Sequence, residues 1–313
     1  MSEAMLERSL GSAEAVLGAE PVLERAPLGL DRVGQEPGDP NPYRRRRHVD
    51  RAAAELALPR GDLSPFQRAF RNWVSRTIAW LVMKPLFRVT VVNPEQFGIG
   101  PALYCFNHMS WLDTVVVIHV FPKQPRLYMY GPKEENIHHG GRNRFMWWTG
   151  LPVPFSPNKD DVLTSVRWAQ AVFDSGGVLA IAAEGRIHVH EGDLLPFQEG
   201  AAYLALRAGV PIVPVAITGT SWARFRGQIT VRLGEPIQTG ERPTREVVAR
   251  YTARSWHALK AMVADDRDMS PPGRIERWFT DWFNDWGPGG REAASLVTGP
   301  DPADVPYGPR AAG

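Results

Sequence analysis

The chain has 313 residues, 43% of them hydrophobic and 22% charged, which is enough for one or two domains with a sizeable core. Its formal net charge of +2 argues against a dedicated nucleic-acid binder. The single cysteine, Cys105, excludes an intrachain disulfide framework and suits a reducing compartment.

Residues 1–60 are predicted to form a mostly disordered basic tail. Pro and Gly cluster in 34–42, and consecutive arginines fill 44–47. This basic block is either a solvated flexible segment or one attracted to anionic lipid headgroups, where each charge contributes roughly 1 kcal/mol. The start of the chain carries acids and no continuous apolar stretch, so we expect no secretory signal there.

Residues 66–83 predict an amphipathic basic helix. Arg68, Arg71 and Arg76 alternate with apolar side chains at near-helical spacing, which are Phe66, Phe70, Trp73, Ile78 and Leu81. We expect this helix to pack on the core, to lie on a membrane surface, or to do both. No window of the sequence reaches the roughly 20 uninterrupted apolar residues that a spanning helix needs.

Strand and helix patterns then alternate. Strands are predicted at 89–92, 102–106, 126–131, 151–155, 178–183, 210–218 and 228–237, and helices at 111–120, 143–150, 160–177, 200–209 and 243–266. This alternation predicts that residues 61–267 form an α/β domain with a mostly parallel mixed sheet flanked by helices. The prolines of 210–218 favour a place for that strand near an edge or a bulge.

Residues 268–313 read as an aromatic-rich C-terminal extension. Within 274–286, four apolar side chains lie three or four positions apart: Ile275, Phe279, Trp282 and Trp286. Such a stripe either packs on the domain or forms an interfacial anchor, because indole rings favour the headgroup region of a membrane.

The segment NHMSWLD, 107–113, lies where a predicted strand gives way to a helix. Ser110 fits the N-cap position and Asp113 fits the N3 position of a capping box, which leaves His108 in the preceding turn. On one continuous helix His108 and Asp113 would point about 140° apart. Across a turn, the carboxylate can reach back to the imidazole.

A histidine and a carboxylate in this arrangement suit general base chemistry. Neutral His108 can accept a proton from a hydroxyl group, and Asp113 can fix the tautomer and stabilise the imidazolium. The alternative is that Asp113 only caps the helix and His108 is a turn residue, and the spacing alone does not exclude it. AAEGR, 182–186, also follows a predicted strand, and offers either a ligand site or a salt-bridged turn.

Together these segments resemble the glycerolipid acyltransferase family, of the 1-acyl-glycerol-3-phosphate O-acyltransferase type. The resemblance covers roughly 85–220. Its N-H-x4-D motif is matched by Asn107, His108 and Asp113. Its later motifs are matched by Glu184 and Gly185, by Pro196, Phe197, Gly200 and Ala201, and by VPIVPV at 210–215.

The resemblance implies a glycerol-phosphate acyltransferase-like fold and an acyl transfer. His108 would deprotonate an acceptor hydroxyl that attacks the thioester of acyl-CoA or acyl-carrier protein, with Asp113 orienting His108. Asn107, Glu184, Gly185 and Pro214 would belong to the substrate site. The family implies no metal or redox cofactor. It implies a peripheral protein on the cytoplasmic face of the cell membrane, with membrane lipids as partners.

Two departures from the family pattern affect the acceptor. Arg186 and Ile187 replace the threonine and arginine that follow Glu-Gly in the family, and Pro154 and Phe155 stand where its second motif has an acid and an arginine. Either Arg186 or Lys159 supplies the positive charge for a phosphate, or the acceptor carries no glycerol phosphate. The default acceptor is 1-acyl-glycerol-3-phosphate.

Two readings from other classes remain. A metal-dependent hydrolase would use His138, His139, His188 and His190, although no H-E-x-x-H motif is present. A catalytically silent lipid-binding protein would keep the fold without the reaction. The sequence carries no indication of oligomeric state.

Overall fold

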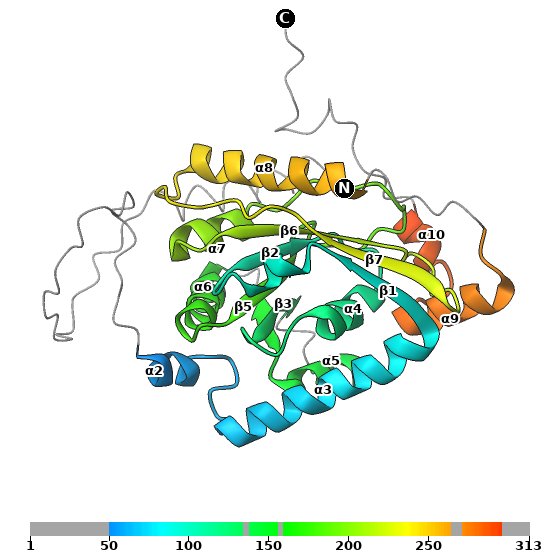
Figure 1. Ribbon diagram of the computed structural model, residues 1–313, viewed down its shortest axis with the longest axis horizontal. Coiled ribbons are helices and arrows are strands. Elements are labelled where there is room, and N and C mark those ends of the chain that lie inside the picture. The colour runs from blue at the N-terminus through cyan, green and yellow to red at the C-terminus, as the bar shows by residue number, and fades with distance from the viewer. Residues whose placement is uncertain (1–49, 134–137, 156–158, 264–270, 296–313) are drawn as a thin grey trace, which may run out of the picture.

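The computed structural model describes residues 50–133, 138–155, 159–263 and 271–295 (Figure 1). Residues 1–49 of the predicted tail and residues 296–313 of the predicted extension lie outside the described residues. Within the described ranges, no helix is both long and apolar enough to cross a membrane.

A seven-stranded sheet forms the centre of the molecule, in the order β1-β7-β6-β2-β5-β3-β4. Every neighbouring pair is parallel except β6 and β7. This confirms the predicted mostly parallel mixed sheet. The strands are β1 Phe87–Val92, β2 Leu103–Phe106, β3 Leu127–Lys133, β4 Pro152–Phe155, β5 Val178–Ala182, β6 Ile212–Thr218 and β7 Gly227–Leu233.

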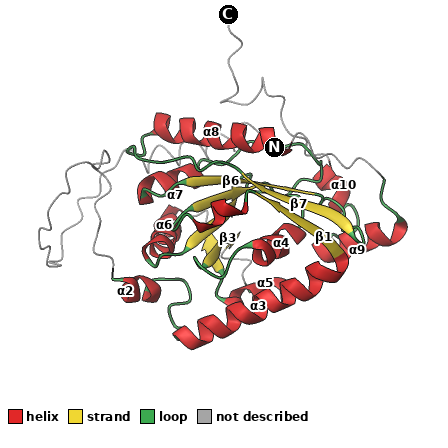
Figure 2. Cartoon of the chain, in the orientation of Figure 1, coloured by secondary structure: helices red, strands yellow, loops and turns green. Residues whose placement is uncertain are grey.

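Helices cover both faces of the sheet (Figure 2). One apolar core lies under α6, α7 and α8, and the other under α3, α4 and α5. Because β2 and β6 are covered on both faces, their sequences are continuous apolar runs. The helices are α2 Arg51–Leu56, α3 Pro65–Leu86, α4 Leu112–Val120, α5 Gly140–Thr149, α6 Lys159–Asp174, α7 Gly200–Ala208, α8 Arg245–Val263, α9 Arg274–Asn284 and α10 Gly290–Ser295, with the 3-10 turn η1 at Pro94–Gly98.

The proline-containing strand β6 is not at the edge of the sheet, contrary to the expectation from its sequence. It lies between β7 and β2. Pro214 is tolerated there because antiparallel pairing with β7 begins only at the next residue, Val215, opposite Leu233. The carbonyl of Pro214 still accepts a hydrogen bond from Gly234 N at 2.8 Å. The antiparallel pairing of β6 with β7 therefore starts just after Pro214, which has no N–H to donate.

The structure already begins inside the segment predicted to be a disordered tail. Asp50 caps α2 by accepting from Ala52 N at 3.0 Å, and Leu58 beyond the helix is only 4% exposed within the core. A six-residue, alanine-rich helix has no apolar stripe, so its periodicity gives no signal. The boundary expected at residue 61 is therefore too late by about one short helix.

Helix α3 confirms the helix predicted at 66–83, but its apolar stripe faces away from the core. Ser64 and Gln67 form a capping box at its start. Its buried positions are Arg68, Ser75, Ala79 and Met83. The outer face of α3, which is the apolar stripe of the sequence, is exposed: Phe66 78%, Phe70 48%, Trp73 60%, Ile78 42% and Leu81 57%, with Trp80 at 47%.

Arginine side chains attach α3 to the domain. Arg71 donates to the carbonyl of Trp148 at 2.8 Å, and Arg76 donates to the carbonyl of Phe121 at 2.6 Å. Arg68 donates to the carbonyl of Glu55 at 3.2 Å. Because α3 binds the domain through these arginines, its outer apolar face makes no comparable contact with the described part of the domain.

Candidate active site

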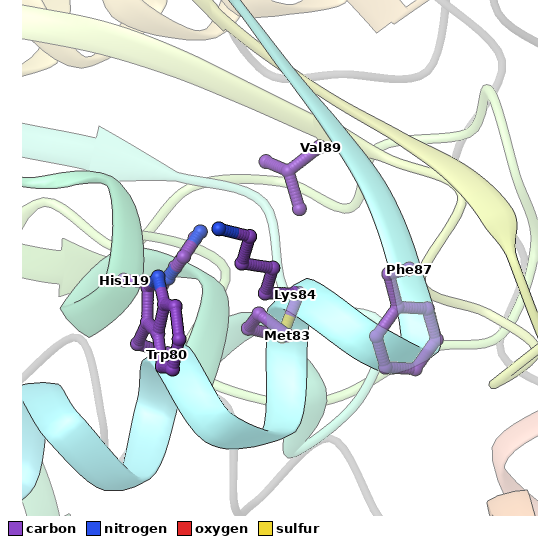
Figure 3. Close-up of a pocket in the computed structure, with 6 residues that line it drawn as sticks. All are labelled: Trp80, Met83, Lys84, Phe87, Val89 and His119. Atoms are coloured by element: carbon purple, nitrogen blue, oxygen red, sulfur yellow. The ribbon is translucent and has the colours of Figure 1, made fainter.

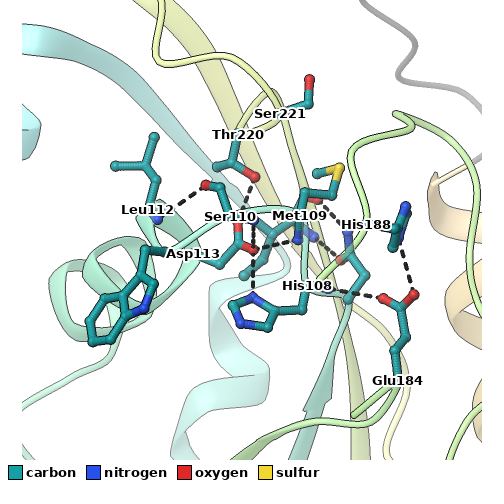
Figure 4. A network of polar contacts seen from close by, with 12 residues as sticks. His108, Met109, Ser110, Leu112, Asp113, Glu184, His188, Thr220 and Ser221 are labelled. Atoms are coloured by element: carbon teal, nitrogen blue, oxygen red, sulfur yellow. Dashed lines mark hydrogen bonds and ion pairs between the residues drawn. The ribbon is translucent and has the colours of Figure 1, made fainter. Parts of the chain in front are cut away.

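The predicted site residues gather at the carboxyl ends of three adjacent strands. The strands β6, β2 and β5 are neighbours in the sheet, and the segments that leave them begin at Gly219, Asn107 and Ala183. Ligands of open α/β sheets bind at this edge. Figure 4 shows the polar network that joins the three segments.

Asp113 is at the centre of this network. Its side chain is fully buried, and its Oδ2 lies 3.0 Å from Nδ1 of His108. The same oxygen accepts from the backbone N–H of Met109 at 2.7 Å and of Ser110 at 2.9 Å. The hydroxyl of Thr220 donates to Oδ1. Four donors around one carboxylate fix its orientation.

The helix begins slightly later than the capping box predicted. α4 starts at Leu112, and the hydroxyl of Ser110 accepts from Leu112 N at 3.1 Å instead of from the N3 position. The return half of the capping box is present, because Asp113 reaches back to Ser110 N. Asp113 therefore caps the turn and orients His108 at once, so the two readings of this motif are compatible.

His108 is the exposed member of the pair, with 20% of its side chain accessible. Its ring meets that of Phe106 edge-on, with centroids 6.0 Å apart. Because Nδ1 faces the carboxylate, Nε2 is the ring nitrogen left to take a proton from a substrate. An imidazole held this way has the geometry of a general base.

Asn107 braces the strand ends. Its Oδ1 accepts from Ile217 N, and its Nδ2 donates to the carbonyl of Ile217, both at 2.8 Å. The side chain is almost fully buried, so it continues the contact between β2 and β6 by one rung. This places Asn107 under the site, where it fixes the position of His108.

Glu184 also lies under the site, with no exposed side-chain surface. Its Oε1 accepts from His108 N at 2.9 Å, and its Oε2 accepts from Leu195 N at 2.8 Å. His188 Nε2 is 3.0 Å from Oε2, yet it falls outside hydrogen-bonding geometry, so we count it as a contact only. The burial of Glu184 gives it a bracing position instead of a place on the surface of the acceptor site.

The remaining predicted site residues occupy different places. Gly185 and Arg186 are exposed at the carboxyl end of β5, and Gly185 has a left-handed φ of 71°. Pro214 is buried within β6, four positions before its end, so the structure does not bring it to His108 and Asp113. Lys159 begins α6, and its side chain lies outside the described residues.

Two polar residues that the sequence reading missed complete the network. They are Thr220, which follows β6, and Glu191, which accepts from Gly219 N at 2.9 Å and from Ser221 N at 3.1 Å. Burial raises the pKa of the Glu191 carboxyl, and the nearby charge of Asp113 acts in the same direction. The available signal was position, because Thr220 comes directly after a buried strand at the ligand-binding edge.

The histidines considered for a metal site do not converge on one. Among the residues that the structure describes, no three His, Cys, Asp or Glu side chains are grouped to hold a metal ion. Cys105 is buried in β2, and burial raises the pKa of its thiol, which disfavours a thiolate nucleophile.

A shallow pocket of about 260 Å³ lies apart from the dyad network, between α3, β1 and the end of α4 (Figure 3). Its lining is Trp80, Met83, Lys84, Phe87, Val89 and His119. None of these residues contacts His108 or Asp113 through the bonds described above, so we do not assign the pocket to the reaction.

Comparison with known proteins agrees with the resemblance seen in the sequence motifs. Residues 88–218 match the Acyltransferase family model, a range that contains the whole His108 network apart from Thr220 and its neighbours. Over this range the chain is similar to the acyltransferase family.

Similar proteins are distant in sequence. The 1-acyl-sn-glycerol-3-phosphate acyltransferase of Saccharomyces cerevisiae is 27% identical, over 58% of this chain and 63% of that protein. The alpha form of the human enzyme of that name is 29% identical, over 60% and 66%. The match thus spans slightly less than two thirds of these relatives.

A solved structure is also similar. It is the 1-acyl-sn-glycerophosphate acyltransferase PlsC from Thermotoga maritima, with 19% sequence identity and a TM-score of 0.49, covering 69% of this chain and 93% of that chain.

Proposed function

We propose that this protein is an O-acyltransferase that moves a fatty acyl group from acyl-CoA or acyl-carrier protein to a lipid hydroxyl. The observation that carries the proposal is the His108–Asp113 pair, in which a fully buried carboxylate lies 3.0 Å from Nδ1 of a partly exposed imidazole. A catalytically silent lipid-binding protein would have no use for a buried carboxylate held against an accessible histidine.

The proposed reaction follows from this geometry. Nε2 of His108 takes the proton of the acceptor hydroxyl as its oxygen attacks the thioester carbonyl. The tetrahedral intermediate collapses with cleavage of the carbon–sulfur bond, and the departing thiolate receives the proton back from the imidazolium. Asp113 stabilises that imidazolium while it exists.

The acceptor is proposed to be 1-acyl-glycerol-3-phosphate, the substrate named for the similar yeast and human proteins. Arg186 supports this choice. It is an exposed cation in the segment that follows β5, and a guanidinium group can bind a phosphate. The competing proposal is an acceptor without a glycerol phosphate, since Pro154 and Phe155 replace the charged pair that the resemblance leads us to expect.

We also propose that the outer face of α3 rests on a lipid surface, which makes this a peripheral membrane protein. The face consists of six large apolar side chains that point away from the domain, while arginines bind inward. Both substrates of the proposed reaction carry acyl chains, so a lipid surface is where they are concentrated.

The decisive experiment incubates the purified full-length chain with labelled acyl-CoA or acyl-carrier protein and a panel of lysolipids, and identifies products by mass. His108→Ala and Asp113→Asn should each lower turnover by on the order of 10²–10⁴-fold, because they remove general base catalysis and its orientation. His139→Ala is the matched control, since this histidine is exposed and its side chain makes no capping hydrogen bond at the start of α5. Normal turnover by His108→Ala would sink the mechanism.

A further inference from the structure

Helix α9 carries an exposed apolar surface close to the proposed active site. We define the outer face of α9 as Ile275, Trp278 and Trp282, which are 80%, 66% and 63% exposed. The two indole rings stack with their centroids 6.4 Å apart. Large apolar side chains gathered in this way usually mark an interaction surface.

The opposite side of α9 packs on the domain. Phe279 and Phe283 pack against the core, and Thr280 and Asn284 are buried. Of the stripe expected from the sequence, Phe279 therefore packs inward, whereas Ile275 and Trp282 point outward. The two readings of this stripe, core packing and interfacial anchor, apply to opposite faces of one helix.

Two hydrogen bonds fasten α9 to the segments that hold the dyad. Trp111 N donates to Oδ1 of Asn284 at 2.7 Å, and Ala223 N donates to the hydroxyl of Thr280 at 2.9 Å. Trp111 lies in the turn between His108 and Asp113, and Ala223 lies three residues after Thr220. Any surface that binds the outer face of α9 is thereby held at a fixed position relative to the catalytic pair.

The segment between β6 and β7 contacts both the end of α3 and α9 (Figure 1). Arg226 N donates to the carbonyl of Leu86 at the end of α3, and Arg224 pairs with Glu276 of α9 at 3.5 Å. Between these two contacts Phe225 is 73% exposed. An exposed aromatic side chain is thus present between the end of α3 and α9.

The charge around α9 indicates which partner fits this surface. Arg274 and Arg277 are exposed on α9, and Arg277 lies over the ring of Trp222. The nearby acids Glu276 and Asp285 are paired with Arg224 and Arg142. Indole rings favour the region of lipid headgroups, and guanidinium groups bind their phosphates. A surface of tryptophan and arginine suits an anionic bilayer, whose charge the arginines complement.

We infer that α9 is a second lipid-docking element, which seats the catalytic edge of the sheet on an anionic membrane together with α3. The inference rests on the proposed function and deepens it. It adds a second lipid-binding helix beside α3, and this helix is hydrogen-bonded to the turn that carries His108 and Asp113. It predicts that both helices contribute to membrane affinity.

The test measures co-sedimentation of the full-length chain with vesicles of phosphatidylcholine, with and without phosphatidylglycerol. Trp278→Ser combined with Trp282→Ser should weaken binding about tenfold, because two indole rings lose their place in the interface. Leu163→Ser is the matched control, since Leu163 is 55% exposed on α6 and should change nothing. Thermal unfolding of each variant shows that the fold is kept.

A second variant covers the case in which the double substitution fails to fold. Arg274→Glu should weaken binding to vesicles with phosphatidylglycerol and leave binding to phosphatidylcholine alone unchanged. Unchanged binding by both variants would overturn the inference. So would a dimer in solution that the tryptophan substitutions dissolve, because the face would then belong to a second copy. Co-sedimentation measures membrane binding without turnover. A failure of the proposed acyl transfer would therefore be distinguishable from a failure of α9 to bind membranes.

Discussion

At the scale of single residues, the position of His108 depends on groups that never reach the substrate. Asn107 and Glu184 hold the backbone that leads into its Cα, and Asp113 holds its ring. The sequence predicted the meeting of His108 and Asp113, because a turn between strand and helix follows from local signals. It did not predict that Glu184 points inward, because a position at the end of a strand leaves the direction of the side chain open.

Thr220 offers a test of this positioning. Thr220→Val keeps the shape of the side chain but leaves Oδ1 of Asp113 buried without the hydroxyl donor. We expect the free energy of unfolding to fall by about 1–3 kcal/mol and kcat to fall about tenfold, as the carboxylate loses its alignment. Thr220→Ser keeps the hydroxyl and should stay close to the wild type in both measurements, which are chemical denaturation and initial rates. Equal values for the valine and serine variants would refute the role of the hydroxyl.

At the scale of elements, α3 shows what periodicity can and cannot establish. The recurrence of apolar residues predicted a helix at 66–83, and the structure has one at Pro65–Leu86. Periodicity does not say which face turns inward, because both faces repeat with the same spacing. The inward direction is decided by tertiary contacts, here the carbonyl groups of Phe121 and Trp148 that receive Arg76 and Arg71.

Opposite substitutions on α3 should therefore have opposite effects. Phe70→Ser combined with Trp73→Ser should abolish most binding to vesicles with little change in thermal stability, since both side chains are exposed. Arg76→Ala should cost about 1 kcal/mol of stability, because two partly buried carbonyl groups, of Phe121 and Pro122, lose their donor. Vesicle sedimentation and thermal unfolding separate the two. Unfolding of the serine variant at a much lower temperature would mean that the apolar face packs inward after all.

At the scale of the whole molecule, the site exists because three strands distant in the sequence lie side by side. Alternating strands and helices predicted a mostly parallel sheet, and the structure has one. The order of the strands was not predictable from the same pattern, because neighbours such as β2 and β6 are brought together by long-range packing. For that reason the sequence could place Thr220 just after a buried strand, but it could not show that Thr220 meets Asp113 from 107 positions away.

The start of the fold is a property of the whole molecule that two truncations can locate. Removing residues 1–49 should leave the melting temperature and the activity in detergent unchanged, because the Pro- and Gly-rich stretch at 34–42 and the arginines at 44–47 predict a disordered tail. Removing residues 1–60 also takes away Leu58, which is 4% exposed in the core, and the carbonyl of Glu55 that receives Arg68.

The longer truncation should therefore cost about 2–3 kcal/mol and lower the melting temperature by roughly 4–10 °C in differential scanning calorimetry. The shorter truncation is its matched control. Equal melting temperatures for the two proteins would place the start of the stable fold after residue 60, where the sequence pattern alone had put it. A shorter truncation that loses activity would show instead that the first 49 residues take part in the function.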